Sequence, residues 1–447
     1  MCYNNHSTSI ILYQNTNYGK YNLSFGEKNM KTVGIICEYN PFHNGHLRQL
    51  RLAREAVGED CALVCLMSGN YVQRGEPAVY PKAVRAEAAL RCGADLVLEL
   101  PLTAALSSAE GFAAGGVEIL SALGCDFLCY GMESEDNNLL MSTAKANLDP
   151  AFDSLLRAGL ETGCSYAAAR QRALEALGAG AGLNAPNDLL AVEYLKALLR
   201  LHSPMDPLPI RRTGSYHAET LDPAAPSATA IRSILCRDEH RSSASFVKPS
   251  PLAEGAERSE ADEGGFPPAA ATPWRAAIPV SIHSLYADAP VHSLQAGERA
   301  VLAILRSLPD AAFQALPYGS EGLWSKLMKA CRACGSTEEI LSAVKSKRYA
   351  LSRIRRMLLC AVLGLTATDL KKQPPYVRVL GFDRTGRALL REWKPRFPLV
   401  NAGERPADAA YYALECRAAD LYSLFSVQGP RPAGEEGRQR VICLPDA

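Results

Sequence analysis

Apolar runs with the length of buried β-strands recur through the first half of the chain. They lie at 32–38, 61–68, 94–100 and 125–131, and segments with helical periodicity separate them. Strands that are apolar along their whole length and alternate with helices are typical of a parallel sheet covered on both faces. The pattern from residue 31 to about 201 therefore predicts an α/β domain. Ligands of such sheets bind at the carboxyl ends of the strands.

The pattern changes sharply near residue 248. Residues 248–273 contain five prolines and five acidic residues with almost no periodic apolar positions, so this stretch is unable to build a packed core. Beyond it, the chain looks mainly helical at 280–370 and β-like at 376–382. We predict four parts: a disordered extension at 1–29, an α/β domain at 30–245, a disordered insertion or linker at 246–278, and a mainly helical domain at 279–447.

The composition is that of a globular protein with almost no net charge. Of the 447 residues, 48% are hydrophobic and 21% are charged, as in a globular protein with a sizeable core. The net charge is only +1, so attraction to nucleic acid would require a local patch. The longest apolar run, 357–365, is far too short to cross a bilayer, and we expect no membrane partner.

The 14 cysteines are scattered, and several lie in the apolar runs. Free cysteine behaves as a small buried hydrophobe, so a reducing cytoplasm fits better than a disulfide framework. Cys331 and Cys334 have the spacing of a zinc site but no second pair. We interpret them as structural cysteines and expect no metal site, the alternative being a metal or redox centre.

The most informative motif follows the first predicted strand. The turn residues Asn40-Pro41 precede His43, Gly45 and His46, after which helical periodicity begins. A helix start offers unpaired N–H groups and a positive dipole to a phosphate, and Gly45 lets the backbone approach a ligand closely. Two imidazoles could donate hydrogen bonds to charge developing on a phosphoryl group. The alternative interpretation is two ordinary loop histidines.

Two other segments could contact an anion. Gln73 and Arg74 carry donors that could face a carboxylate or phosphate, unless they belong to a solvated loop. Ser227, Thr229 and Arg232 lie near a predicted helix start and could grasp a second phosphate. An ordinary capped helix with a surface arginine is the competing interpretation of these three.

Together these motifs resemble a known family. His43-Asn44-Gly45-His46 is the HxGH arrangement of the nucleotidylyltransferase superfamily, and the segment 227–232 resembles the ISSTxxR signature that accompanies it. The whole string 38–46 (EYNPFHNGH), with Pro186-Asn187-Asp188 and the segment 210–213, resembles the tRNA(Met) cytidine acetate ligase family. The resemblance implies a Rossmann-like nucleotidylyltransferase domain, binding ATP and acetate, followed by a mainly helical tRNA-binding domain.

The resemblance also implies an activity. Such an enzyme is an ATP-dependent ligase that activates acetate as acetyl-adenylate, releases pyrophosphate, and acetylates N4 of the wobble cytidine of elongator tRNA(Met). ATP and acetate are then substrates, Mg²⁺ is a candidate cofactor, and His43 and His46 are the catalytic residues. The ATP-binding residues would be Ile36, Cys37, Glu38, Tyr39, Asn40, Pro41, Phe42, His43, Asn44, Gly45, His46, Leu47, Arg48, Gln49, Gly131, Asn187, Arg212, Thr213, Ser227, Thr229 and Arg232. A slip of one residue would exchange Arg212 for Arg211.

A basic segment supplies a separate signal for RNA. Six cations occur within twelve residues and without one acid: Lys345, Lys347, Arg348, Arg353, Arg355 and Arg356. If the segment is one helix, Arg348, Arg355 and Arg356 share a face, which would make a compact site for phosphates. A solvated basic helix that packs its apolar side inward explains the pattern as well.

Two other functions stay open at this point. One is a small-molecule adenylyl- or cytidylyltransferase, although such enzymes seldom need a long basic helical region. The other is a non-catalytic, nucleotide-regulated tRNA-binding protein, against which the intact His43, Gly45, His46 and Arg232 argue.

Overall fold

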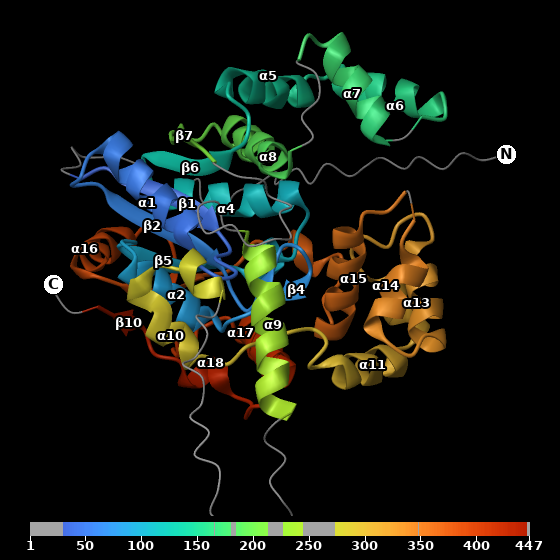
Figure 1. Cartoon of the computed structure of the whole chain (residues 1–447). Helices are drawn as coiled ribbons and strands as arrows, with labels where there is room; N and C mark the ends of the chain where they lie inside the picture. The colour runs from blue at the N-terminus through green and yellow to red at the C-terminus, as the bar shows by residue number, and fades with distance from the viewer. Residues whose placement is uncertain are drawn as a thin grey trace, which may run out of the picture.

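One large sheet runs through the molecule, and helices cover both of its faces (Figure 1). The computed structural model describes residues 30–164, 166–179, 185–212, 227–244, 273–346 and 348–444. The predicted extension at 1–29 and residues 246–272 of the predicted insertion or linker at 246–278 lie outside these ranges. Disorder is the wrong prediction for residues 273–278, because Trp274 and Ala277 of η2 (Pro273–Ala277), and Ile278 directly after it, are buried in the core.

The sheet has the strand order β10-β8-β5-β2-β1-β6-β7, and β9 pairs with β8 outside this path. Its first five strands in the chain are β1 (Thr32–Cys37), β2 (Ala62–Ser68), β5 (Leu96–Leu100), β6 (Phe127–Met132) and β7 (Asp206–Arg211). These five pair in parallel, with Ile35 opposite Cys65 in the centre. Every residue of β2 is buried, because helices cover both faces there. The predicted α/β class and parallel sheet are confirmed.

Strand β7 forms one edge of the sheet. Its sequence contains Pro207 and Pro209, which have no N–H to donate. An edge strand tolerates them because it pairs on one side only, here with β6.

The C-terminal part of the chain completes the same sheet, which corrects the predicted boundary at 279. β8 (Val377–Phe382) pairs antiparallel with β5, and β9 (Leu399–Asn401) and β10 (Ile442–Cys443) pair in parallel with β8. The sequence predicts the strand at 376–382 but not its partner, because β5 lies in the first hundred residues. The region from 279 onward is therefore not a separate helical domain.

The helices form three groups. On one face of the sheet lie α4 (Ala109–Leu123), α8 (Pro186–Arg200) and α16 (Arg384–Trp393), and on the other lie α1 (Asn44–Val57), α2 (Lys82–Arg91), α9 (Ala228–Ala244) and α10 (His283–Ala287). The third group has its own core and lies beside β4 in Figure 1; it contains α11 (Glu298–Ser307), α12 (Asp310–Gln314), α13 (Leu323–Ala333), α14 (Thr337–Val344) and α15 (Leu351–Leu363). The remaining helices are α3 (Leu102–Ala105), α5 (Asn137–Leu148), α6 (Phe152–Glu161), α7 (Tyr166–Ala176), α17 (Ala409–Tyr422) and α18 (Glu435–Arg438).

A buried cluster of charges ties the C-terminal elements to the sheet. Lys82 Nζ lies 2.7 Å from Glu99 Oε2 and 2.8 Å from Glu436 Oε2. Arg378 of β8 lies 2.7 Å from Glu415 and 2.9 Å from Glu436. Since these groups are withdrawn from water, each charge depends on its partners.

Candidate active site

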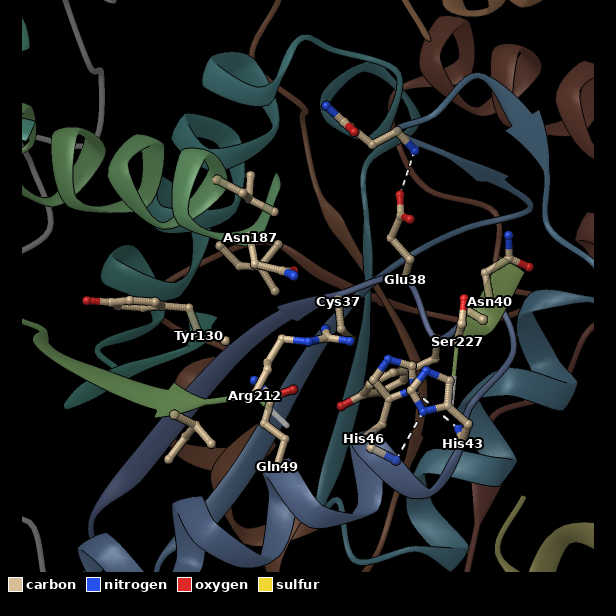
Figure 2. A pocket seen from close by; sticks show the side chains of 18 of the residues that line it. Cys37, Glu38, Asn40, His43, His46, Gln49, Tyr130, Asn187, Arg212 and Ser227 are labelled. Atoms are coloured by element: carbon tan, nitrogen blue, oxygen red, sulfur yellow. Dashed lines mark hydrogen bonds between the residues drawn. The ribbon is translucent and has the colours of Figure 1, made fainter. Parts of the chain in front are cut away.

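A cavity of about 420 Å³ opens where β1, β6 and β7 end. It is lined from segments far apart in the chain: the loop after β1, the first turn of α1, the hairpin of β3 (Tyr71–Val72) and β4 (Glu76–Pro77), the end of β6, one face of α8, the end of β7 and the start of α9. Figure 2 shows several of these side chains, among them Cys37, His46 and Arg212, around a common space. The cavity thus lies at the carboxyl ends of parallel strands, where such sheets bind ligands.

The cavity brings most of the predicted nucleotide residues together. Among them are Ile36, Cys37, Glu38, Tyr39, Asn40, His43, Asn44, Gly45, His46, Arg48, Gln49, Gly131, Asn187, Arg212, Ser227, Thr229 and Arg232. Three of the predicted residues do not line it: Pro41, Phe42 and Leu47, of which Phe42 is fully buried in the core. Thr213 lies outside the described residues.

His43 and His46 are held by the start of α1. His43 caps the helix, with its Nδ1 accepting a hydrogen bond from Gly45 N at 3.1 Å, and His46 Nδ1 accepts from His43 N at 3.3 Å. The two rings stack with centroids 3.8 Å apart. A Cβ at position 45 would lie 2.9 Å from the His43 ring, so glycine is required for this packing. Because each Nδ1 accepts, a neutral ring carries its proton on Nε2 and is a donor there.

Burial keeps both rings neutral. His43 is only 2% exposed, and burial, with smaller effects of Arg212 and Arg232, lowers its pKa to about 3. Burial also lowers the pKa of His46 well below its ordinary value, helped by His43 and Arg212. Near pH 7 both imidazoles are therefore neutral, and each offers an Nε2–H donor to the site without adding a positive charge.

The start of α9 lies beside the loop that carries the histidines. Ser227 precedes the helix and is buried, and Arg232 Nη1 donates to the backbone carbonyl of Asn40 at 2.7 Å. Arg232 Nη2 also donates to Thr229 Oγ1 at 3.3 Å. These contacts fix a cation and a helix start beside the loop after β1, an arrangement suited to phosphate oxygens.

The geometry distinguishes Arg212 from Arg211. The Arg212 side chain packs over Gly131, where a Cβ would lie 3.1 Å from its Cδ, and burial lowers its pKa. Arg211 is exposed and pairs with Glu135 at 2.6 Å. Both arginines line the cavity, and Arg212 is the one whose side chain packs against Gly131; its contact with ATP stays a prediction.

The loops after β1 and β2 are pinned by buried polar contacts. Arg85 Nη1 donates to the carbonyls of Glu38 at 2.6 Å and Ser68 at 3.0 Å. Glu38 Oε1 in turn accepts from Gln73 N at 2.6 Å, which positions the β3–β4 hairpin. The sequence alone does not indicate that Arg85, on α2, holds two strand ends.

One wall of the cavity is aromatic and apolar, and the motifs in the sequence do not predict it. Phe112, Tyr130, Leu190 and Tyr194 line it. A signal was available, because Asn187, Leu190 and Tyr194 recur at spacings of three and four and so share a face of α8. This wall is suited to a flat ring such as a nucleobase.

The predicted shared face of the basic segment is wrong. Helix α15 begins only at Leu351, and Ser346 and Tyr349 form a turn before it, so Lys345 and Arg348 are not on the helix. Lys345 is exposed, and Arg348 pairs with Glu321 at 2.8 Å while staying largely exposed. Lys347 lies outside the described residues.

The other three cations of the segment contact the protein itself. Arg353 Nη2 donates to the Tyr318 carbonyl at 2.8 Å, and Arg355 forms an ion pair with Glu76 of β4. Arg356 is only 7% exposed, and its Nη1 donates to the Gln73 carbonyl at 3.0 Å. Arg355 and Arg356 therefore connect α15 with the hairpin that lines the cavity.

The described part of the chain holds no group of three or more His, Cys, Asp or Glu side chains placed to bind a metal ion. Its cysteines, including Cys331 and Cys334, are free thiols. None of its helices combines the length and apolarity needed to cross a bilayer.

The strand–loop–helix carrying two histidines, at the carboxyl edge of a parallel sheet, defines a nucleotidyl transferase, and the family described as HIGH nucleotidyl transferase matches residues 30–433. The tRNA(Met) cytidine acetate ligase of Acetivibrio thermocellus is 33% identical and covers 93% of this chain and 100% of its own length. That of Clostridium novyi is 35% identical and covers 82% of this chain and 88% of its own. The chain therefore belongs to the tRNA(Met) cytidine acetate ligase family, whose members are enzymes.

Two solved structures are similar over almost the whole chain. Apo Thermotoga maritima TmcAL (form I) has a TM-score of 0.77 at 29% identity and covers 93% of this chain and all of its own. The same protein bound with alpha-thio ATP has a TM-score of 0.74 at 29% identity and the same coverage.

Proposed function

We propose that this protein joins acetate to elongator tRNA(Met) in two steps. In the first, ATP and acetate give acetyl-adenylate and pyrophosphate. In the second, the acetyl group moves to N4 of the wobble cytidine and AMP is released. The names of the relatives and the ATP analogue bound to a similar structure support this assignment.

The observation that carries the proposal is the pair of neutral imidazoles at the start of α1. His43 and His46 present Nε2–H donors to the same cavity that Arg232 and the start of α9 enter. In the first step an acetate oxygen attacks the α-phosphorus, and the bond from that phosphorus to the bridging oxygen breaks. Positioning and charge stabilisation then supply most of the acceleration, and no covalent enzyme nucleophile is required.

The remaining residues suggest how the substrates divide the cavity. Adenosine would lie against the wall of Tyr130, Asn187 and Tyr194, with Gly131 and Arg212 near the ribose and phosphates. Ser227, Thr229 and Arg232 would hold the departing pyrophosphate. Among the described lining residues, Glu38 alone offers a magnesium ion anionic oxygen atoms, so Mg²⁺ would arrive with the phosphates of ATP.

We propose that the tRNA binds a basic surface made of fewer of the predicted cations. Lys345 and Arg348 are exposed beside the start of α15 and could reach phosphates. Arg355 and Arg356 would act through the hairpin instead.

One experiment tests the function as a whole. The protein is incubated with ATP, labelled acetate and unmodified tRNA(Met), and the RNA is digested to nucleosides. Label on the anticodon cytidine is expected, and a transcript with uridine at that position should stay unlabelled. A small-molecule nucleotidyl transferase would leave both transcripts unlabelled and exchange pyrophosphate without acetate. A non-catalytic binding protein would bind ATP and release no pyrophosphate.

A further inference from the structure

Glu38 is the sole carboxylate among the described residues that line the cavity. The charged side chains around it are five arginines: Arg48, Arg74, Arg211, Arg212 and Arg232. Such a positive lining suits a triphosphate, whereas a carboxylate repels one. Glu38 therefore calls for an explanation other than phosphate binding.

The carboxylate is held in a defined position. Glu38 directly follows β1, its carbonyl accepts from Arg85, and its Oε1 accepts from Gln73 N at 2.6 Å. Figure 2 shows Glu38 with a dashed line from its carboxyl group, which marks the hydrogen bond that it accepts from Gln73 N. Burial raises the pKa of Glu38, and the Gln73 N–H and Arg74 offset part of that rise.

The second chemical step needs a proton acceptor. When the cytidine N4 attacks the acetyl carbonyl carbon, an N–C bond forms and the C–O bond to the phosphate breaks. AMP leaves with the electron pair of that bond, and the nitrogen must lose one proton. A positioned base accelerates such transfers.

The two histidines are poorly suited to this task. Each Nδ1 already accepts a backbone N–H, and each neutral ring carries its proton on Nε2. The low pKa of His43, about 3, also makes it a weak base. Cys37 is no better, because burial raises its pKa and keeps it a thiol.

We propose that Glu38 accepts the proton of the cytidine N4 amine during acetyl transfer and then releases it to solvent. The proposal rests on the proposed function, and it assigns to Glu38 a catalytic role in the second step. Gln73 acts as its positioning residue by fixing one carboxylate oxygen.

The test separates the two steps. Glu38→Gln keeps an oxygen that can accept from Gln73 N, but it removes the base. Single-turnover acetyl transfer to tRNA(Met) should fall about 10²–10⁴-fold, whereas acetate-dependent ATP–pyrophosphate exchange, which also reports ATP binding, should fall much less. Glu161→Gln, an exposed carboxylate at the end of α6 and outside the lining, is the matched control and should change neither rate.

The pH dependence gives a second readout that does not require the variant to fold. Transfer by wild-type protein should slow as the pH falls through the raised pKa of Glu38, because the protonated acid is not a base. The transfer rate of Glu38→Gln should not show this decrease at low pH. The proposal would be overturned by equal loss of both steps in the variant, by unchanged transfer in the variant, or by a wild-type transfer rate that does not decrease at low pH. Wild-type protein without acetate-dependent exchange would instead refute the proposed function.

Discussion

Arg356 Nη1 donates a hydrogen bond to the Gln73 carbonyl at 3.0 Å, which joins helix α15 to the hairpin of the cavity. The two elements also approach closely through their backbones, since a Cβ on Gly75 would lie 2.3 Å from Arg356 N. Gln73 N in turn holds Glu38. The position of the cavity wall therefore depends on a helix in the C-terminal half of the chain.

Replacing Arg356 should impair the first step of the reaction. Arg356→Met removes the bond to Gln73 while keeping an unbranched side chain, so the hairpin loses a support. We expect acetate-dependent ATP–pyrophosphate exchange to fall about 10-fold or more, since small displacements of positioning groups are costly. Lys329→Met, an exposed change on α13, is the control and should leave the exchange rate unaltered. Wild-type exchange in Arg356→Met would show that the hydrogen bond does not position the site.

The exposed cations before α15 should act on RNA alone. Lys345→Glu with Arg348→Glu should weaken tRNA binding and reduce the slope of log affinity against log salt, by about one for each RNA phosphate that is no longer neutralised. Pyrophosphate exchange should stay intact, because neither side chain lines the cavity. Binding titrations at several KCl concentrations measure this, and an unchanged slope would place the tRNA on another surface.

The buried His43 predicts acid sensitivity of the fold. Its pKa is about 3 in the folded protein but ordinary when unfolded, so the unfolded state binds a proton first as the pH falls. Stability from this residue is present above about pH 6.5 and is lost progressively between about 6.5 and 3. Urea unfolding of wild type and His43→Asn at pH 7 and pH 5 checks this. The variant should lose less stability on acidification, and an equal loss would contradict the assignment.

The buried charge cluster should be sensitive to loss of one member. Lys82→Met leaves Glu99 without its cation and Glu436 with Arg378 alone, so the free energy of unfolding should fall by about 3–5 kcal/mol. Arg91→Met, which breaks a surface pair with Glu87, should cost less than about 1 kcal/mol. Equal effects in denaturant titrations would show that the cluster does not hold the C-terminal elements to the sheet.

The local hydrophobic pattern of the sequence predicts the β-strands well where they are apolar and lie in the centre of the sheet. The run at 61–68 corresponds to β2 (Ala62–Ser68), and the run at 32–38 to β1. β7 is absent from the predicted strands because its two prolines obscure the pattern of a strand. The local sequence also does not reveal that β8 pairs with β5, because this pairing joins residues that are far apart in the chain.

For the site, the sequence identifies residues with distinctive chemistry and misses those whose role depends on packing. His43, His46 and Arg232 could be proposed from their motifs. Arg356 was predicted to face RNA, because charge alone does not reveal whether an arginine is exposed or holds a carbonyl. Its orientation follows from tertiary contacts between α15 and the hairpin.

The central claim is that the paired imidazoles let acetate displace pyrophosphate from ATP. The most direct measurement is ATP–pyrophosphate exchange with and without acetate, in wild type and His46→Ala. We predict exchange that requires acetate and falls about 10²–10³-fold in the variant, as loss of one transition-state donor does. Exchange that is independent of acetate, or that persists at the wild-type rate in His46→Ala, would contradict the account.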